Sequence, residues 1–180
     1  MLFRSPSRTI RDGVQGHRIK AEVVEVAGLR VETIADTLIH LGSMLSVDEL
    51  VVACESVVRG RGDLQTLAAR ALHYKGSRGY GTVQRALGRV RLGAESPAET
   101  RTRLLITDSG LPEPIAQHVV RDASGAFVAR LDLAWPDLML AVEYDGQQHR
   151  LDSVQYALDL ERHRRLQQVG WLVIRVTKED

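Results

Sequence analysis

Three carboxylates, Asp132, Glu143 and Asp145, interrupt or directly follow two very apolar segments of the sequence. A carboxylate is costly in apolar surroundings unless it is paired, hydrogen-bonded or bound to a cation. We expect the two segments to be neighbouring strands that bring the three groups together at one edge of a sheet. Such oxygen ligands suit Mg²⁺ or Mn²⁺, and a divalent cation can serve phosphodiester hydrolysis in several ways. The pattern therefore predicts a magnesium (or manganese) site in which these three residues are both metal ligands and catalytic residues.

Two further residues are candidates for the same catalytic site. Glu99 lies three positions after Ser96, so it fits a capping box as well as a metal-binding role. His149 follows the acidic segment closely, and an ordinary loop position and a general-acid or phosphate-contacting role are both open for it. The pair Asp145-Gly146 is also a turn signal, and Asp145 shares the face of Glu143 only if the strand stays extended.

Composition limits the class of protein. The chain has 180 residues, 44% of them hydrophobic, which is enough for a core, and its net charge of +1 gives no whole-molecule attraction for nucleic acid. Cys54 is the lone cysteine and lies in an apolar run, which predicts a buried thiol in a reducing cytoplasm. No apolar run approaches the roughly 20 residues of a membrane span, and no signal-peptide pattern opens the chain, so we expect no membrane association.

The first part of the chain, residues 1–92, predicts a small hairpin followed by helices. Alternating β-branched residues around Gly28 indicate two short strands. Ser46 with Glu49 is a capping box that opens a helix, and Asp63 can cap the next helix. We expect a further helix over residues 82–92. This region shows no clustered acids, and we expect it to carry no catalytic group.

The second part, residues 93–180, predicts the order αβββαβ. Ser96, Pro97 and Glu99 form a strong helix start, and Gly110 and Gly170 are helix stops. The expected helices end near residue 109 and cover about 153–169, and the expected strands cover about 117–121, 127–133, 138–144 and 171–176. The fold class is therefore α/β.

This order and these residues resemble the PD-(D/E)XK nuclease superfamily, and within it the very-short-patch-repair-like (Vsr-like) endonuclease domains found in actinobacteria. The resemblance covers residues 95–180. Its motifs are Ser96-Pro97-x-Glu99, Asp132-Leu133-Ala134-Trp135-Pro136, Val142-Glu143-Tyr144-Asp145-Gly146, His149, Asp159-x-x-Arg162 and Gly170-Trp171-x-Val173-x-Arg175. The first ninety residues resemble, more weakly, the region that follows the winged helix in AbiEi-antitoxin-type proteins, without that winged helix.

The resemblance implies a restriction-endonuclease-like core with a mixed sheet and a magnesium-dependent endonuclease acting on DNA, in defence or repair. The lysine that usually stands two residues after the second acid is replaced by Asp145, which leaves the water-activating group open. Arg150, Arg164 and Arg175 are candidate contacts to the DNA backbone. The alternative is a non-catalytic DNA-binding regulator, or antitoxin-like protein, that keeps a degenerate nuclease fold.

Overall fold

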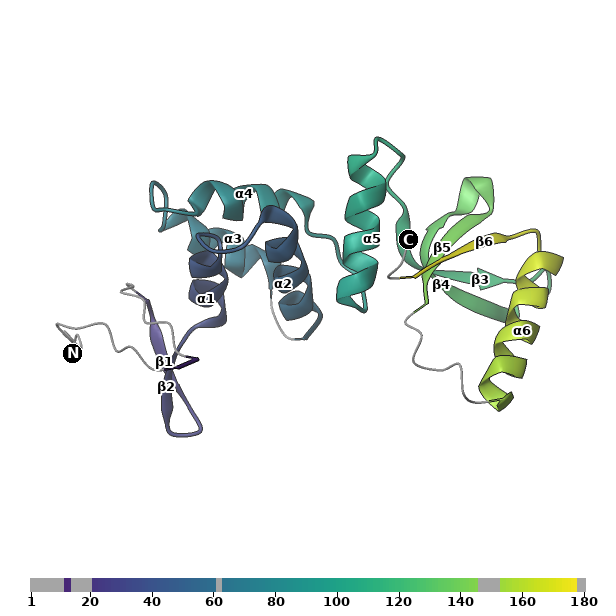
Figure 1. The fold of residues 1–180 in the computed structure, drawn as a ribbon, viewed down its shortest axis with the longest axis horizontal. Helices are drawn as coiled ribbons and strands as arrows, with labels where there is room; N and C mark the ends of the chain where they lie inside the picture. Colours follow the sequence, from purple (N-terminus) through teal and green to yellow (C-terminus); the bar gives the residue numbers. More distant parts are fainter. Residues whose placement is uncertain (1–11, 14–20, 61–62, 146–152, 178–180) are drawn as a thin grey trace.

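The computed structural model describes residues 12–13, 21–60, 63–145 and 153–177, with side chains from residue 157 in the last helix. The protein is mixed α/β, as expected, with a hairpin, a group of helices and a four-stranded sheet (Figure 1). The elements are β1 Val23–Val26, β2 Leu29–Glu32, α1 Ile34–Leu41, α2 Val47–Gly60, α3 Leu64–Leu72, α4 Tyr80–Arg89, α5 Pro97–Asp108, β3 Ile115–Arg121, β4 Phe127–Trp135, the 3-10 turn η1 Pro136–Leu138, β5 Leu140–Tyr144, α6 Ser153–Gln168 and β6 Leu172–Val176.

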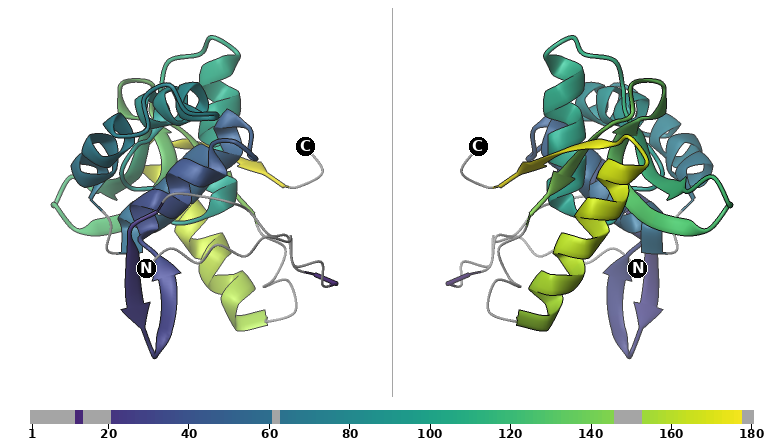
Figure 2. Two further views of the ribbon diagram at one scale, coloured as in Figure 1. Left: turned by 90° about the vertical axis from the view of Figure 1, so that its left-hand side faces the viewer. Right: turned by 90° about the vertical axis from the view of Figure 1, so that its right-hand side faces the viewer.

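The hairpin β1–β2 projects beyond the helices (Figures 1 and 2). Its register pairs Val24 with Val31 and Val26 with Leu29, so these four apolar side chains share one face, and all four are exposed. The backbone continues into α1, where Thr33 caps the helix through the Asp36 N–H.

The helices α1 to α4 pack around a core that includes Leu50, Val51 and Cys54, each no more than 1% exposed. The predicted caps are confirmed: Ser46 and Glu49 form the reciprocal capping box, and Asp63 accepts from the first N–H groups of α3. The helix expected over residues 82–92 is α4, which begins at Tyr80 and ends at Arg89.

The sheet has the order β3-β4-β5-β6, with β3, β4 and β5 antiparallel and β6 parallel to β5. The two helices of this half cover opposite faces (Figure 1). Leu166 of α6 packs with Trp171 and Leu131 in one cluster, while Ile106 of α5 packs with Leu133 and Val142 in the other. The expected αβββαβ order is therefore present.

Helix α5 packs against both the helical core and one face of the sheet. Leu104 belongs to the helical core, whereas Ile106 contacts the sheet. On the same helix, Arg103 is 2% exposed and forms an ion pair with the buried Glu55 of α2 at 2.6 Å. Thr100 donates to the second oxygen of that carboxylate. Helix α5, in the second half of the sequence, therefore packs against the helices of the first half as well as against the sheet.

In the part of the chain that the structure describes, no helix has the length and apolarity needed to cross a membrane.

Candidate functional site

A row of polar residues crosses the sheet at one level. The β4–β5 register pairs Leu133 with Val142, and its continuation places Asp132 opposite Glu143. In the β5–β6 register, Arg175 of β6 lies opposite Glu143. The β3–β4 register places Gln117 across from Asp132. The predicted neighbourhood of Asp132 and Glu143 is therefore found, but in the middle of the sheet.

Glu143 is 9% exposed and is held by Arg162 of α6. Both guanidinium NH groups of Arg162 donate to the carboxylate, Nη1 at 3.1 Å from Oε2 and Nη2 in a closer contact with Oε1. Nη2 also donates to the Arg130 carbonyl at 3.1 Å. The carboxylate raises the pKa of the Arg162 guanidinium, so the arginine stays charged and serves as the counter-charge of this buried acid.

The carboxyl group of Asp132 has a strongly raised pKa. Burial, together with the negative charges of Glu99 and Glu143, raises the pKa of its carboxyl group to about 6. The N–H of Tyr144 donates to Asp132 Oδ2 at 3.2 Å and, with the Arg162 charge, offsets part of this rise in pKa. Such a carboxyl group can accept or release a proton near neutral pH, which is the property required of a general acid or base.

Glu99 projects from the first turn of α5 and is 8% exposed. Ser96 caps the helix by accepting from the Glu99 N–H at 3.1 Å, so the predicted cap is confirmed. The Glu99 carboxylate accepts from the backbone N–H of Glu95 at 2.8 Å and from Gln117 Nε2 at 2.9 Å. The negative charge of Glu99 also raises the pKa of the Asp132 carboxyl group.

Gln117 is a site residue that the sequence reasoning missed. Its φ of +54° lies in the left-handed region, which non-glycine residues rarely adopt. On the neighbouring strand β4, the regular alternation of side chains between the two faces of the sheet is interrupted. Leu131 packs on the α6 side, whereas Leu133, two residues later, packs on the α5 side. No local sequence signal marks this irregularity, which aims the Gln117 amide at Glu99.

Asp145 follows the end of β5, and its N–H donates to the Val176 carbonyl at 2.8 Å. The described residues, which include Asp132, Glu143 and Asp145, contain no group of three or more His, Cys, Asp or Glu side chains arranged to hold a metal ion. The expected three-carboxylate group is thus not formed. Asp132, Glu143 and Glu99 supply the hard oxygen atoms that Mg²⁺ prefers, but a cation would gain Glu143 as a ligand only if Arg162 released it.

The remaining predicted residues are cations and one histidine. Arg164 is exposed and lies 4.0 Å from Glu161 on the same helix. Arg175 is exposed on the edge strand β6, beside Glu143. His149 and Arg150 lie outside the residues that the structure describes.

The chain is similar to two curated proteins of Mycobacterium tuberculosis, the uncharacterized protein Rv2248 of strain ATCC 25618 / H37Rv and the uncharacterized protein MT2308 of strain CDC 1551 / Oshkosh. Each is 26% identical over 167 residues, which cover 91% of this chain. The chain spans about 60% of the length of these relatives. No family profile and no solved structure match it.

Proposed function

We propose that the chain is a metal-dependent endonuclease that hydrolyses DNA phosphodiester bonds. The observation that carries the proposal is Asp132, a half-buried acid with a pKa near 6, set opposite Glu143 inside an αβββαβ core. An acid with a strongly perturbed pKa beside other charged groups is typical of a functional site. The αβββαβ order also supports the resemblance to PD-(D/E)XK nucleases.

Each residue of the site has a role in the proposal. Asp132 and Glu143 would hold the cation, Mg²⁺ or Mn²⁺, which supplies charge neutralisation for the phosphate and a more acidic bound water. Burial and the negative charge of Glu99 raise the pKa of the Asp132 carboxyl group in the metal-free protein, and a bound cation would stabilise its ionised form. Arg162 neutralises Glu143 in the metal-free protein and would have to release its carboxylate when the cation binds. The exposed Arg164 and Arg175 are proposed contacts to the DNA backbone.

A second candidate function is DNA binding without catalysis. This function is favoured by the ion pair that Arg162 already forms with Glu143, and by the lack of a three-ligand group among the described residues. In such a protein the acid–arginine pair would only stabilise the sheet, and nucleic acid would bind equally with or without a divalent cation. For either function we propose a cytoplasmic location, which agrees with the buried free thiol of Cys54.

The deciding experiment is nicking of supercoiled plasmid DNA with Mg²⁺ or Mn²⁺, against the same reaction in EDTA. We expect metal-dependent nicking by the native protein and its loss in Asp132→Asn. Asp137→Asn is the matched control, because Asp137 is an exposed aspartate on the nearby turn η1. Absence of nicking together with metal-independent DNA binding in a gel-shift assay would replace the enzyme with the DNA-binding protein.

A further inference from the structure

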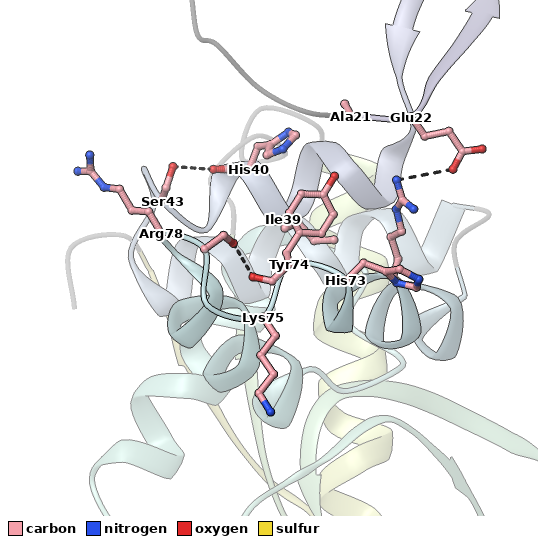
Figure 3. Close-up of a pocket in the computed structure, with 11 residues that line it drawn as sticks. Ala21, Glu22, Ile39, His40, Ser43, His73, Tyr74, Lys75 and Arg78 are labelled. Carbon is pink, nitrogen blue, oxygen red and sulfur yellow. Dashed lines mark hydrogen bonds and ion pairs between the residues drawn. The ribbon is translucent and has the colours of Figure 1, made fainter.

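A hollow of about 820 Å³ opens in the helical half of the protein, far along the chain from the acidic row (Figure 3). It is formed by α1, α3, the loop that joins α3 to α4, and the residues just before β1. The lining residues that matter for binding are Glu22, His40, Arg70, Tyr74, Lys75 and Arg78. This volume lies within the roughly 300–1,000 Å³ that is usual for small-molecule sites.

Two side chains that line the hollow, Arg70 and Tyr74, are held in place by hydrogen bonds to a fully buried aspartate. Asp36 is 0% exposed and accepts from Arg70 Nε at 2.7 Å, Arg70 Nη2 at 2.8 Å and the Tyr74 hydroxyl at 2.8 Å. The N–H of Glu22 donates to the same carboxylate at 2.6 Å. Two wall side chains, a guanidinium and an aromatic ring, are therefore held in position before any ligand arrives, which reduces the entropy lost on binding.

A third wall residue is fixed in a similar way. His40 Nδ1 lies 2.7 Å from a carboxylate oxygen of Glu32, and the His40 ring stands edge-on to the Tyr74 ring at 5.5 Å between centroids. The two rings and the Arg70 guanidinium therefore give this wall a fixed, partly aromatic surface (Figure 3).

The rim carries the charge. Lys75 and Arg78 are exposed, and within the described part of the chain neither side chain has an ion-pair partner. Their long side chains extend outward in Figure 3, and exposed side chains of this kind change rotamer rapidly. The acid in the lining is Glu22, which lies 3.7 Å from Arg70. The two unpaired cations therefore give the rim a net positive charge.

We propose that this hollow binds a phosphate-bearing ligand of nucleotide size, with the phosphate at the rim, where Lys75 and Arg78 reach it by a change of rotamer, and the remainder against Tyr74 and His40. Cations bound to a phosphate form charge-assisted hydrogen bonds, and Arg binds it with a planar fork of donors. The phosphate can come from a free mononucleotide or from the end of a nucleic-acid strand. This proposal stands independently of the proposed endonuclease activity, since it involves none of the residues of the acidic row.

The test is calorimetric titration of the full chain with adenosine 5′-monophosphate, with adenosine, and with a short oligodeoxynucleotide carrying a 5′-phosphate or a 5′-hydroxyl. We expect saturable binding of the monophosphate and none of adenosine. Binding of the 5′-phosphorylated strand but not of the mononucleotide would assign the site to strand ends. Arg78→Gln should weaken binding about tenfold, as expected for loss of a charge-assisted bond.

The matched control is Arg85→Gln, which removes the same charge from an exposed position on α4 outside the hollow. Its affinity for the monophosphate should stay within about twofold of the native value, since a distant exposed charge is screened by salt. Equal weakening by Arg78→Gln and Arg85→Gln would show attraction by overall charge and overturn the site. No saturable binding of any phosphorylated probe would also overturn it.

Discussion

Replacement of Asp132 by asparagine should stabilise the protein at neutral pH. Burial, together with the charges of Glu99 and Glu143, raises the pKa of Asp132 from its ordinary 3.8 to about 6, so the folded state binds a proton more tightly than the unfolded state. This stabilising contribution is fully present below pH 4 and is lost as the pH rises through 6. Above pH 6 the native protein carries an ionised carboxylate in an unfavourable environment.

The magnitude follows from the two pKa values. At about 1.4 kcal/mol per pKa unit, the raised pKa of Asp132 lowers the free energy of unfolding, relative to its value at low pH, by up to about 3 kcal/mol at pH 7.5 and by about 1 kcal/mol at pH 4.5. Asparagine keeps an oxygen that can accept from the Tyr144 N–H, so the hydrogen bond need not be lost. Asp132→Asn should therefore gain about 2 kcal/mol more at pH 7.5 than at pH 4.5.

The assay is urea unfolding of the native protein and Asp132→Asn at both pH values, with exposed Asp137→Asn as the control. The control should change the free energy of unfolding by less than about 0.5 kcal/mol at either pH, as is usual for a surface substitution. A stabilisation by Asp132→Asn that is equal at the two pH values, or absent at pH 7.5, would refute the reasoning. A gain in stability with a loss of nicking would be the stability–activity trade-off expected of an active-site acid.

Three further predictions concern the helical half and its junction with the sheet. Glu55→Ala leaves the buried Arg103 without its main partner and should lower the free energy of unfolding by about 3–5 kcal/mol. The apolar double variant Glu55→Leu with Arg103→Met should recover most of that loss. Equal destabilisation by the single and the double variant would contradict the ion-pair explanation. Ser96→Ala removes the α5 cap and should cost about 1 kcal/mol, measured by urea unfolding, while Ser96→Asp should keep the native value. Burial raises the pKa of the Cys54 thiol to about 11, so alkylation at pH 8 should be slow until urea unfolds the chain, and fast labelling of the folded protein would contradict its burial.

The order of elements was determined by the sequence itself, because its signals are local. Ser46 with Glu49, Asp63 and Ser96 each satisfy N–H groups within three residues along the chain, so the caps predicted from spacing are the caps observed. The apolar segments around Asp132 and Glu143 were identified as strands for the same reason, and the buried Cys54 followed from its apolar neighbours.

The composition of the site was decided by tertiary structure. Arg162 pairs with Glu143, which lies nineteen positions earlier in the sequence, and Gln117 donates to Glu99, which lies eighteen positions earlier, so neither contact has a sequence spacing that predicts it. Asp145 shares a sequence motif with Glu143 but follows the end of β5, and the described residues contain no three-ligand group.

The sharing of α5 between two cores is likewise a tertiary result. Sequence spacing separates residues 1–92 from 93–180, yet Leu104 and Arg103 face the helices while Ile106 faces the sheet. A helix presents different faces to different neighbours, and only the packed chain determines which neighbour each face meets. The sequence therefore determined which residues carry charge and the order of the helices and strands, and the three-dimensional packing determined which charged side chains form ion pairs with each other.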